Sequence, residues 1–408
     1  MLGSTENLQG ALKSLSGSVS GRQGDARMKI DPMHDSSYDS TLDAILRESN
    51  IETREYQRKI VLKTWRELSN GIRSILIHSP TGSGKTVMGL LACRGLELTE
   101  NLRIGWVAMR RNLLAQAHKE NELKRLGVNL VTFSMFDRNP PTELDVIVVD
   151  EAQHDCCNSM MAIHGLIKPK YIIGLSATPF RADKLKLCFD KVVRDAGIHQ
   201  LIQDGYLSQY HHYTLPSFRP EQVAEAYLRD QNRWGKSLIY FHKISDCKIA
   251  AQRLLKHGVN AEVVTGSSDR ERQLEAFATG DIQVLVNSQV LVEGMDEPTI
   301  KTVFVRPSGC SSTIQMAGRV FRKLPEHDYK QVVQCQDTRW PMTRSAQAAM
   351  QYSWTDGQWR SLQANEELVS ISQKTVLALA SIQVALPEFI GKPKSKRVQR
   401  IAESATEE

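Results

Sequence analysis

The sequence lacks the features that mark membrane-spanning and disulfide-bonded secreted proteins. No apolar run approaches the length of a membrane-spanning helix, and the first residues do not form a secretory signal. The seven cysteines are an odd number without a CxxC pair, and the adjacent Cys156 and Cys157 suit neither a zinc site nor a disulfide framework. We therefore expect reduced, mostly buried thiols in an intracellular, cytoplasmic protein without a membrane partner.

The length and composition indicate a soluble protein with more than one domain. The chain has 408 residues, more than one hydrophobic core usually holds. Hydrophobic residues make up 41% of it and charged residues 24%, as in ordinary globular proteins. The net charge of +6 permits a polyanionic partner but does not require one.

Short apolar runs alternate with amphipathic stretches from about residue 50, the pattern of a parallel sheet flanked by helices. In the first half, strands are expected at 74–78, 103–108, 128–133, 145–149 and 171–175. The pattern pauses around 204–220, and strands are then expected at 237–241, 261–265, 282–286, 301–305 and 329–334. Helices are expected at 110–126, 244–257, 268–279 and 311–322. The sequence thus predicts an α/β protein with tandem parallel-sheet domains over 46–208 and 209–340.

Both ends of the chain differ from this pattern. Residues 1–45 are rich in Ser, Gly and polar residues and are interpreted as a flexible arm, although their basic excess also leaves an organelle transit peptide open. Residues 341–408 form an extension in which 343–386 are interpreted as helices. The basic run 392–400 is either a solvated tail or a nucleic-acid contact.

A glycine-containing loop follows the first expected strand in "SILIHSPTGSGKT" (74–86). Gly82 and Gly84 let backbone N–H groups turn inward and form an anion site, to which the next helix adds its positive N-terminal end. Lys85 can reach the β- and γ-phosphates of a nucleotide, and the hydroxyl of Thr86 can bind magnesium. The loop residues expected to bind nucleotide are Ser79, Pro80, Thr81, Gly82, Ser83, Gly84, Lys85 and Thr86. Ser79 stands where the general form of this loop has glycine.

Two adjacent carboxylates end the apolar run "VIVVDEAQHD" (146–155). Asp150 lies at the carboxyl end of an expected strand, where ligands of open α/β sheets bind, and can provide a second anchor for a magnesium–nucleotide complex. Glu151 can then orient and polarise the attacking water. Together with the glycine loop, this pair predicts a nucleoside triphosphatase that uses ATP and Mg²⁺.

Several further stretches follow in an order that resembles the superfamily 2 helicases of the DExH/DEAD type, over about residues 50–335. The stretches are "REYQ" (54–57), "VAMRRNLLAQ" (107–116), "DEAQH" (150–154), "GLSATP" (174–179), "SLIYFHKISD" (237–246), "VLVNSQVLVEGMDEP" (284–298) and "QMAGRVFR" (315–322). The stretches "GLSATPFRADK" (174–184) and "DAGIHQLIQDGYLSQY" (195–210) especially resemble compact bacterial and phage DExH helicases, related in pattern to the XPB and UvsW motors. The resemblance implies two RecA-like domains, the first carrying the ATP-binding motifs and the second the helicase C-terminal motifs, followed by a helical extension.

The resemblance also assigns roles to residues. It places Arg54 and Gln57 at the nucleotide, with Gln57 bonded to the adenine edge, and places Gly294 and Asp296 at the same site. It gives the coupling between nucleotide and nucleic acid to His154, Ser176 and Thr178. Taken alone, His154, Ser176 and Thr178 could also be ordinary polar turn residues, but their order in the sequence favours the coupling role.

The closing motif can also be interpreted physically. Gln315, Arg319 and Arg322 are three or four residues apart and would share one helical face. A basic surface helix is one interpretation, but apolar residues between them favour a buried helix that presents its arginines across a cleft. An arginine supplied by the second domain would stabilise charge on the transferring phosphoryl group and make hydrolysis depend on domain closure.

Nucleic-acid contacts are expected mainly to phosphates, which makes them sequence-tolerant and salt-sensitive. The candidates are Arg110, Arg111, His242, Lys243 and Ser288, although exposed basic residues are often only solvated surface. Two stretches depart from the family pattern: "VTFSMFDRNPP" (131–141) matches loosely, and "VNSQ" (286–289) lacks a common threonine.

Three functions remain open from the sequence. The first is an ATP-dependent helicase or translocase, with DNA favoured over RNA by resemblance. The second is an RNA helicase with the same core. The third is an ATP-gated interaction module that does not unwind, although the retention of Glu151, Arg319 and Arg322 favours a motor.

Overall fold

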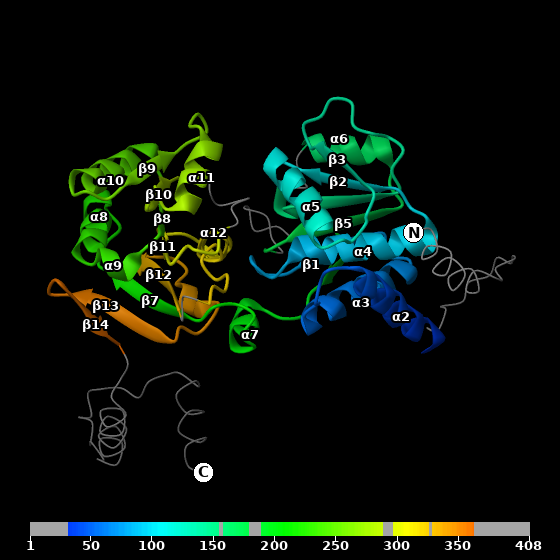
Figure 1. Cartoon of the computed structure of the whole chain (residues 1–408), viewed down its shortest axis with the longest axis horizontal. Coiled ribbons are helices and arrows are strands. Elements are labelled where there is room, and N and C mark those ends of the chain that lie inside the picture. The colour runs from blue at the N-terminus through cyan, green and yellow to red at the C-terminus, as the bar shows by residue number, and fades with distance from the viewer. Residues whose placement is uncertain (1–31, 155–157, 179–188, 289–296, 326–328, 363–408) are drawn as a thin grey trace, which may run out of the picture. The chain divides into compact units, whose positions relative to one another are not determined.

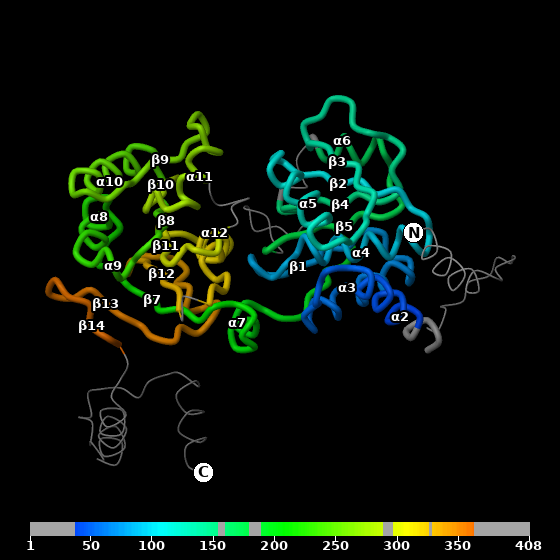
Figure 2. The backbone as a smooth tube through the Cα atoms, viewed as in Figure 1, coloured from blue at the N-terminus to red at the C-terminus, as the bar shows by residue number. Residues whose placement is uncertain are grey.

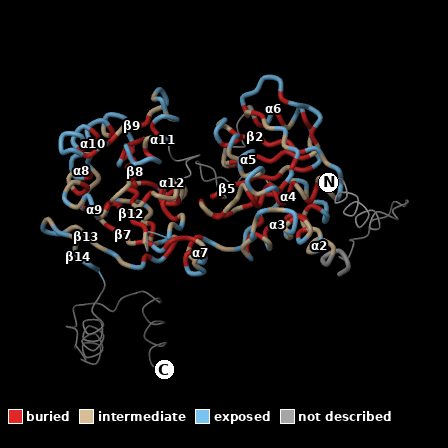
Figure 3. Tube along the Cα trace, in the orientation of Figure 1, coloured by how far each residue is buried: buried red, intermediate tan, exposed pale blue. Residues whose placement is uncertain are grey.

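The computed structural model describes residues 32–154, 158–178, 189–288, 297–325 and 329–362, and these residues build two separate β-sheets (Figure 1). Figure 3 shows that the strands of both sheets are mostly buried. None of the helices in these ranges is both long enough and apolar enough to cross a membrane.

The first sheet has six strands, all of them parallel, in the order β3-β2-β4-β5-β1-β6. Its strands are β1 (Ser74–His78), β2 (Ile104–Ala108), β3 (Leu130–Ser134), β4 (Val146–Asp150), β5 (Tyr171–Ser176) and β6 (Lys191–Val193). The associated helices are α2 (Pro32–Glu48), α3 (Glu55–Ser69), α4 (Lys85–Glu100), α5 (Arg111–Leu123) and α6 (Asn158–Ile167), with a 3-10 turn at Ala152–His154. Parallel order brings the carboxyl ends of β1, β4 and β5 to one edge.

Alternate residues of these strands pack against different helices. Ile75 and Val148 belong to a core with residues of α2, α3, α4 and α5, whereas Leu76 and Val149 pack with Met160 and other residues of α6. Because both faces of the inner strands are covered, β2, β4 and β5 are almost continuously apolar.

The second sheet has eight strands in the order β14-β13-β7-β12-β11-β8-β10-β9. Its strands are β7 (Tyr210–Leu215), β8 (Ser237–Tyr240), β9 (Ala261–Val264), β10 (Val284–Asn287), β11 (Thr302–Phe304), β12 (Lys330–Cys335), β13 (Met350–Thr355) and β14 (Gln358–Ser361). The helices after β6 are α7 (Ile198–Gln203), α8 (Pro220–Arg229), α9 (Gln231–Trp234), α10 (Ile244–Lys256), α11 (Arg270–Thr279) and α12 (Cys310–Ala317), with a 3-10 turn at Met342–Arg344. Only the β13–β14 pair is antiparallel.

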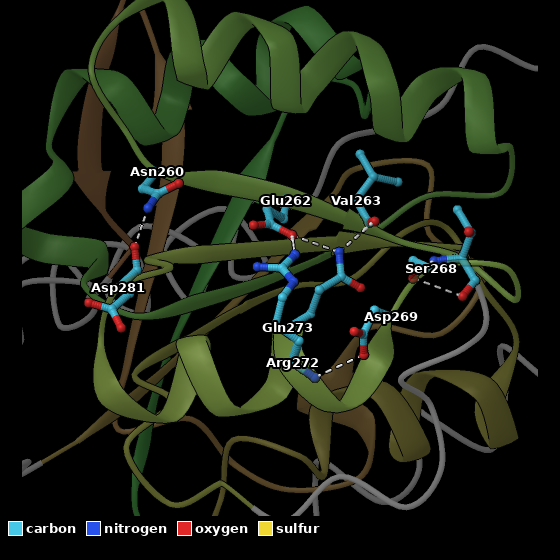
Figure 4. Close-up of polar contacts among 9 residues, drawn as sticks. Asn260, Glu262, Val263, Ser268, Asp269, Arg272, Gln273 and Asp281 are labelled. Carbon is cyan, nitrogen blue, oxygen red and sulfur yellow. Dashed lines mark hydrogen bonds and ion pairs between the residues drawn. The ribbon is translucent and has the colours of Figure 1, made fainter.

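A polar network ties α11 to β9 at the edge of this sheet (Figure 4). Gln273 donates from its amide to Glu262 at 2.8 Å and to the Val263 carbonyl at 3.1 Å, and Glu262 also pairs with Arg272. Asp269 caps the helix by accepting from the backbone N–H of Arg272 at 3.2 Å. These side chains hold the edge strand to the helix that follows it.

Every strand that the sequence predicts overlaps an observed strand, and the helices expected at 110–126, 244–257 and 268–279 correspond to α5, α10 and α11. The helices expected over 343–386 are wrong for residues 350–361, which form the β13–β14 hairpin. Asp356 and Gly357 at its turn have φ of 52° and 74°, the left-handed conformation that a tight hairpin turn requires. Residues 363–386 and the basic run 392–400 lie outside the described residues.

The flexible arm expected over 1–45 is also wrong in its last part, because residues 32–48 form α2. Leu42 and Ile45 of this helix are buried in the first core. Asp39 and Asp43 both form ion pairs with Arg58 of α3. Too few apolar residues lie there for the sequence pattern to reveal a helix, and packing against α3 and α4 supplies its stability.

Four cysteines lie among the described residues, all as free thiols. Cys93, Cys247 and Cys335 are buried, as expected, and Cys310 is exposed.

Candidate nucleotide site

The glycine loop connects β1 to α4 as the sequence predicts. Gly82 and Gly84 have φ of 82° and 81°, a left-handed conformation that glycine adopts without strain. The backbone N–H of Ser79 donates to the Ser176 carbonyl at 3.1 Å, which fixes the start of the loop to β5. Helix α4 begins at Lys85, so its N-terminus points its N–H groups into the loop.

The "REYQ" element holds the glycine loop in place. Tyr56 donates its hydroxyl to the Ser83 carbonyl at 2.7 Å, and Gln57 donates its amide to the same carbonyl at 2.8 Å. A Cβ built on Gly84 would lie 2.6 Å from the Gln57 amide nitrogen, so this approach requires glycine. Gln57 also accepts from the backbone N–H of Arg54 at 3.0 Å. Gln57 thus contacts the loop directly, and its expected contact with adenine stays a prediction.

The two carboxylates lie at the end of β4. Asp150 is buried, and Glu151 has φ of 53°, a left-handed conformation uncommon for a residue with a side chain. Burial raises the pKa of Asp150 to about 7, and the charge of Glu151 adds to this effect. Burial lowers the pKa of Lys85, while Glu151 and Asp150 oppose that shift. A bound cation would favour the ionised form of Asp150.

Gln153, which was not expected from the sequence, connects Glu151 to the "SAT" stretch, residues 176–178. Its amide nitrogen donates to Glu151 at 2.8 Å, and its amide oxygen lies 2.8 Å from the Ser176 hydroxyl. The Ser176 hydroxyl also lies 2.7 Å from the Thr178 carbonyl, and it accepts from the Thr178 N–H at 3.1 Å. The chain of contacts therefore runs from Glu151 through Gln153 to Ser176 and Thr178. Its signal was present in "DEAQH", where Gln153 is the polar residue closest to the two acids.

The arginine motif lies against the glycine loop, but not on a continuous helix. Helix α12 ends at Ala317, and from Arg319 on the N–H groups bond three residues back, Arg319 to the Met316 carbonyl and Val320 to the Ala317 carbonyl. The prediction of a helix to residue 322 with Gln315, Arg319 and Arg322 on one face is therefore wrong, because the chain tightens into a turn. A Cβ built on Gly318 would lie 2.7 Å from Cβ of Thr81, so glycine is needed where this turn meets the loop.

One cavity of about 160 Å³ brings these parts together. It is lined by the loop and α4, the two carboxylates, three residues of α5 and the arginine turn: Thr81, Gly82, Gly84, Lys85, Thr86, Val87, Leu113, Gln116, Glu120, Asp150, Glu151, Arg319 and Arg322. Gln116 closes the stretch 107–116 that the sequence analysis singled out, but its place in the cavity was not expected. Gln315 is half-buried on α12 and does not line the cavity.

The side chains present fit a nucleoside triphosphate with magnesium. The hydroxyls of Ser79 and Ser83 in the loop and of Thr178 in the "SAT" stretch are buried without a hydrogen-bond partner among the described residues. Lys85 and the two arginines supply positive charge for phosphates. In the described ranges no three His, Cys, Asp or Glu side chains converge, so magnesium at Thr86 and Asp150 would take its other ligands from phosphate and water.

Comparison with known proteins agrees with this geometry. Residues 50–136 match the family model of the type III restriction enzyme res subunit, and residues 219–323 match that of the helicase conserved C-terminal domain. "Putative helicase 22" of Sulfolobus islandicus filamentous virus is 26% identical over 351 residues, covering 67% of this chain and 62% of the relative. "Putative DNA 3'-5' helicase Rad25" of Halobacterium salinarum is 26% identical over 327 residues, covering 67% of this chain and 52% of the relative.

The fold is similar to that of a variant of Saccharomyces cerevisiae Dbp5 bound to RNA and ADP BeF3, with a TM-score of 0.53, 14% identity and coverage of 80% of this chain and 98% of that one. The two family-model matches and these helicase relatives support a superfamily 2 helicase core in this chain. The chain spans 62% of the length of the viral relative and 52% of the length of the Halobacterium salinarum relative.

Within the helicase core, the expected nucleic-acid residues all follow carboxyl ends of strands. Arg110 and Arg111 begin α5 after β2, Lys243 precedes α10 after β8, and half-buried Ser288 follows β10. In each of the two sheets this is the edge where ligands of parallel sheets bind, and contact with nucleic acid stays a prediction.

His242 is exposed after β8, but its ring is held by neighbours. Nη1 of Arg306 lies 2.6 Å from Nδ1 of His242, and Nε2 of His242 lies 3.0 Å from the Pro307 carbonyl. Arg306 can only donate, so Nδ1 accepts and Nε2 carries the proton. A hydrogen bond between His242 and nucleic acid would have to replace one of these two bonds.

Some predicted residues of the helicase core lie outside the described residues. Gly294 and Asp296 belong to this group, and His154 is described only as the last residue of its 3-10 turn. The expected roles of these three residues stay predictions.

Proposed function

We propose that this chain is a nucleic-acid-dependent ATPase that couples hydrolysis of ATP to movement along, or unwinding of, nucleic acid, with DNA as the favoured track. The observation that carries the proposal is the cavity of about 160 Å³ shared by the glycine loop, Asp150, Glu151, Arg319 and Arg322. A cavity with all these groups has the components for phosphoryl transfer as well as for binding.

In this mechanism the loop N–H groups and Lys85 hold the β- and γ-phosphates. Thr86 and Asp150 would hold magnesium, which neutralises phosphate charge and leaves the γ-phosphorus open to attack. Glu151 accepts a proton from the attacking water, and Gln153 orients that carboxylate through its 2.8 Å hydrogen bond.

Arg319 and Arg322 complete the proposed reaction. Their guanidinium groups stabilise the charge that develops on the transferring phosphoryl group, a contribution worth about 10³ to 10⁵ in rate in related mechanisms. Both arginines follow α12, whose preceding strand β11 belongs to the second sheet, whereas the loop belongs to the first. Hydrolysis then requires that these two parts of the chain stay together.

DNA is favoured over RNA by the match to the type III restriction enzyme res subunit model and by the relative named as a putative DNA helicase. The similarity to Dbp5, which was solved with RNA, supports an RNA track as the second candidate. The shared chemistry is a phosphate backbone, so the choice depends on direct measurement.

The test is the steady-state ATPase rate with single-stranded DNA, duplex DNA and RNA, each at salt concentrations of about 50 and 200 mM. We expect DNA to stimulate turnover most and the stimulation to weaken at high salt. Lys85→Ala is the inactive control, because it removes a phosphate contact. Stronger stimulation by RNA would reverse the preferred track, and turnover indifferent to all three would exclude a motor and leave a nucleotide-gated module.

A further inference from the structure

The chain between α7 and β7 contacts three parts of the candidate ATPase site: the glycine loop, the Tyr56 side chain that holds this loop, and the arginine turn. This connecting segment, Gly205–Ser208, is drawn in green between α7 and β7 in Figure 2. Its first contact is made by Tyr206, whose ring packs edge-on against the ring of Tyr56 with centroids 5.3 Å apart. The Arg54 guanidinium lies 5.3 Å from the centre of the Tyr206 ring. Tyr206 therefore supports the residue whose hydroxyl holds the Ser83 carbonyl of the glycine loop.

The second contact is made by Leu207, which is 1% exposed. A Cβ built on Gly82 would lie 3.3 Å from a methyl carbon of Leu207 and 3.6 Å from Cγ of Arg322. Gly82 is therefore in contact range of both the connecting segment and the arginine side chain. A change in the position of Leu207 would change the space that the loop and Arg322 share.

The third contact is made by Ser208, which is also buried. Its backbone N–H donates to the Phe321 carbonyl at 2.8 Å, and its hydroxyl donates to the Arg322 carbonyl at 3.2 Å. The ring of Tyr210 packs edge-on against that of Phe321 with centroids 5.2 Å apart. Ser208 thus holds the backbone that carries Arg322.

Local structure fixes the segment that makes these contacts. Helix α7 ends where Gly205 takes φ of 73°, and the N–H groups of Tyr206 and Leu207 both donate to the Leu201 carbonyl, at 2.8 and 2.9 Å. Leu201 is fully buried. Three consecutive residues held in one conformation therefore contact Tyr56, the glycine loop and the arginine turn.

We propose that the connecting segment sets the distance between Arg322 and the glycine loop, and that Ser208 is a positioning residue for ATP hydrolysis. This inference rests on the proposed ATPase function. Ser208 acts through the Arg322 backbone and does not touch the nucleotide. Its loss should therefore lower the rate of hydrolysis and leave ATP binding unchanged.

The test is a double-mutant cycle on the full chain with Ser208→Ala and Arg322→Ala, measured as kcat and KM for ATP with saturating nucleic acid. Ser208→Ala removes one neutral hydrogen bond, and we expect kcat to fall about three- to tenfold with KM unchanged. In the Arg322→Ala background the same substitution should have no further effect. Ser208→Thr, which keeps the hydroxyl, should recover most of the loss.

Ser69→Ala is the matched control, because the Ser69 hydroxyl also bonds a backbone carbonyl, that of Arg66 at 2.9 Å, at the end of α3. It should leave kcat unchanged. An unchanged kcat in Ser208→Ala, or an equal loss from it with and without Arg322, would overturn the positioning role while the ATPase function stood.

Amide hydrogen exchange separates this inference from the function on which it rests. Without nucleotide, Ser208→Ala should speed exchange in a peptide that covers residues 318–322, whereas Ser69→Ala should not. If the wild-type chain hydrolyses no ATP, the proposed function fails, and the exchange rate alone decides the positioning role. Unchanged exchange in Ser208→Ala would then overturn it.

Discussion

Glu151 combines an unusual backbone conformation with a defined partner. A left-handed conformation costs a residue with a side chain roughly 1 to 2 kcal/mol, and such costs persist where function requires them. Here Glu151 has φ of 53°, and the Gln153 amide donates to its carboxylate at 2.8 Å. The strain is therefore consistent with a carboxylate held ready to accept a proton.

Glu151→Gln keeps the size and hydrogen-bonding shape of the side chain but removes its basicity. We expect ATP to bind with near wild-type affinity and kcat to fall by about 10² to 10⁴. Binding is measured with a fluorescent nucleotide and turnover by phosphate release. Glu120→Gln, which changes another acid that lines the cavity from α5, should keep most of the activity. Wild-type turnover in Glu151→Gln would show that another group activates the water.

Arg322→Ala should lower kcat at least a hundredfold with little change in KM, because its guanidinium meets the charge that forms only during transfer. Lys323→Ala, which removes the exposed positive charge of the next residue, is the control for a general electrostatic effect. Rates and KM values come from ATPase assays over a range of ATP concentrations. Equal losses in the two variants would mean that net charge, and not position, accounts for the effect.

At the scale of elements, the turn after α12 depends on the absence of a side chain at Gly318. A Cβ there would lie 2.7 Å from both the Ile314 carbonyl oxygen and Cβ of Thr81. Such close contacts cannot be relieved by rotating a flexible side chain, because backbone atoms and a branched residue are involved. The arginine turn and the glycine loop must therefore separate if this residue is enlarged.

Gly318→Ala should reduce kcat about tenfold or more by moving Arg319 and Arg322 away from the loop. Gly309→Ala provides the matched control, since Gly309 caps the start of the same helix and an added Cβ meets nothing within 4 Å. Kinetics are read together with circular dichroism, so that loss of fold is recognised. The interpretation would be contradicted if both variants kept the wild-type rate.

The contact between α3 and α4 gives a prediction on stability. A Cβ on Gly95 would lie 2.1 Å from the ring of Trp65, whose indole N–H donates to the Ala92 carbonyl at 2.9 Å. Gly95→Ala should therefore destabilise the protein by about 1 to 3 kcal/mol through overpacking. Gly165→Ala in α6, where an added Cβ meets nothing within 4 Å, should instead stabilise it by about 0.5 to 1 kcal/mol. Urea unfolding measures both, and a Gly95→Ala variant as stable as wild type would show that Trp65 can move freely.

At the scale of the whole molecule, the cavity joins residues of the first sheet to an arginine turn that follows strands of the second. A ligand that contacts the glycine loop and the arginine turn should stabilise the two parts together, since binding to the native state raises the free energy of unfolding. A ligand that contacts only the glycine loop should stabilise the arginine turn less. The γ-phosphate is the group that distinguishes these two cases.

A non-hydrolysable ATP analogue with magnesium should therefore raise the Tm more than ADP with magnesium in the wild-type chain. In an Arg319→Ala/Arg322→Ala variant this difference should shrink, while the effect of ADP is retained. Differential scanning calorimetry at saturating nucleotide measures both shifts. An undiminished difference in the double variant would mean that the arginines make no contact with the triphosphate.

A helix or strand can be predicted from the sequence when residues close to one another along the chain determine it. Strands such as 74–78 and 145–149 could be located because both faces of the sheet are covered and the runs are continuously apolar. The hairpin over 350–361 could not, because its strand β13 is half-exposed and gains its pairing from β7, which is more than a hundred residues away in sequence. Helix α2 could not be predicted for a related reason, because its few apolar residues are buried only by packing against α3 and α4.

The sequence by itself determined the glycine loop, the acid pair and the arginine motif, because each is a short stretch whose chemistry depends on neighbours along the chain. Only the tertiary structure showed that Gln153 joins Glu151 to Ser176, that the helix before Arg319 stops at Ala317, and that Tyr206, Leu207 and Ser208 reach three parts of one site. Most of these features depend on residues that are distant in sequence, as Ser176 is from Gln153 and Ser208 is from Arg322. The pattern of neighbouring residues along the chain does not reveal such contacts.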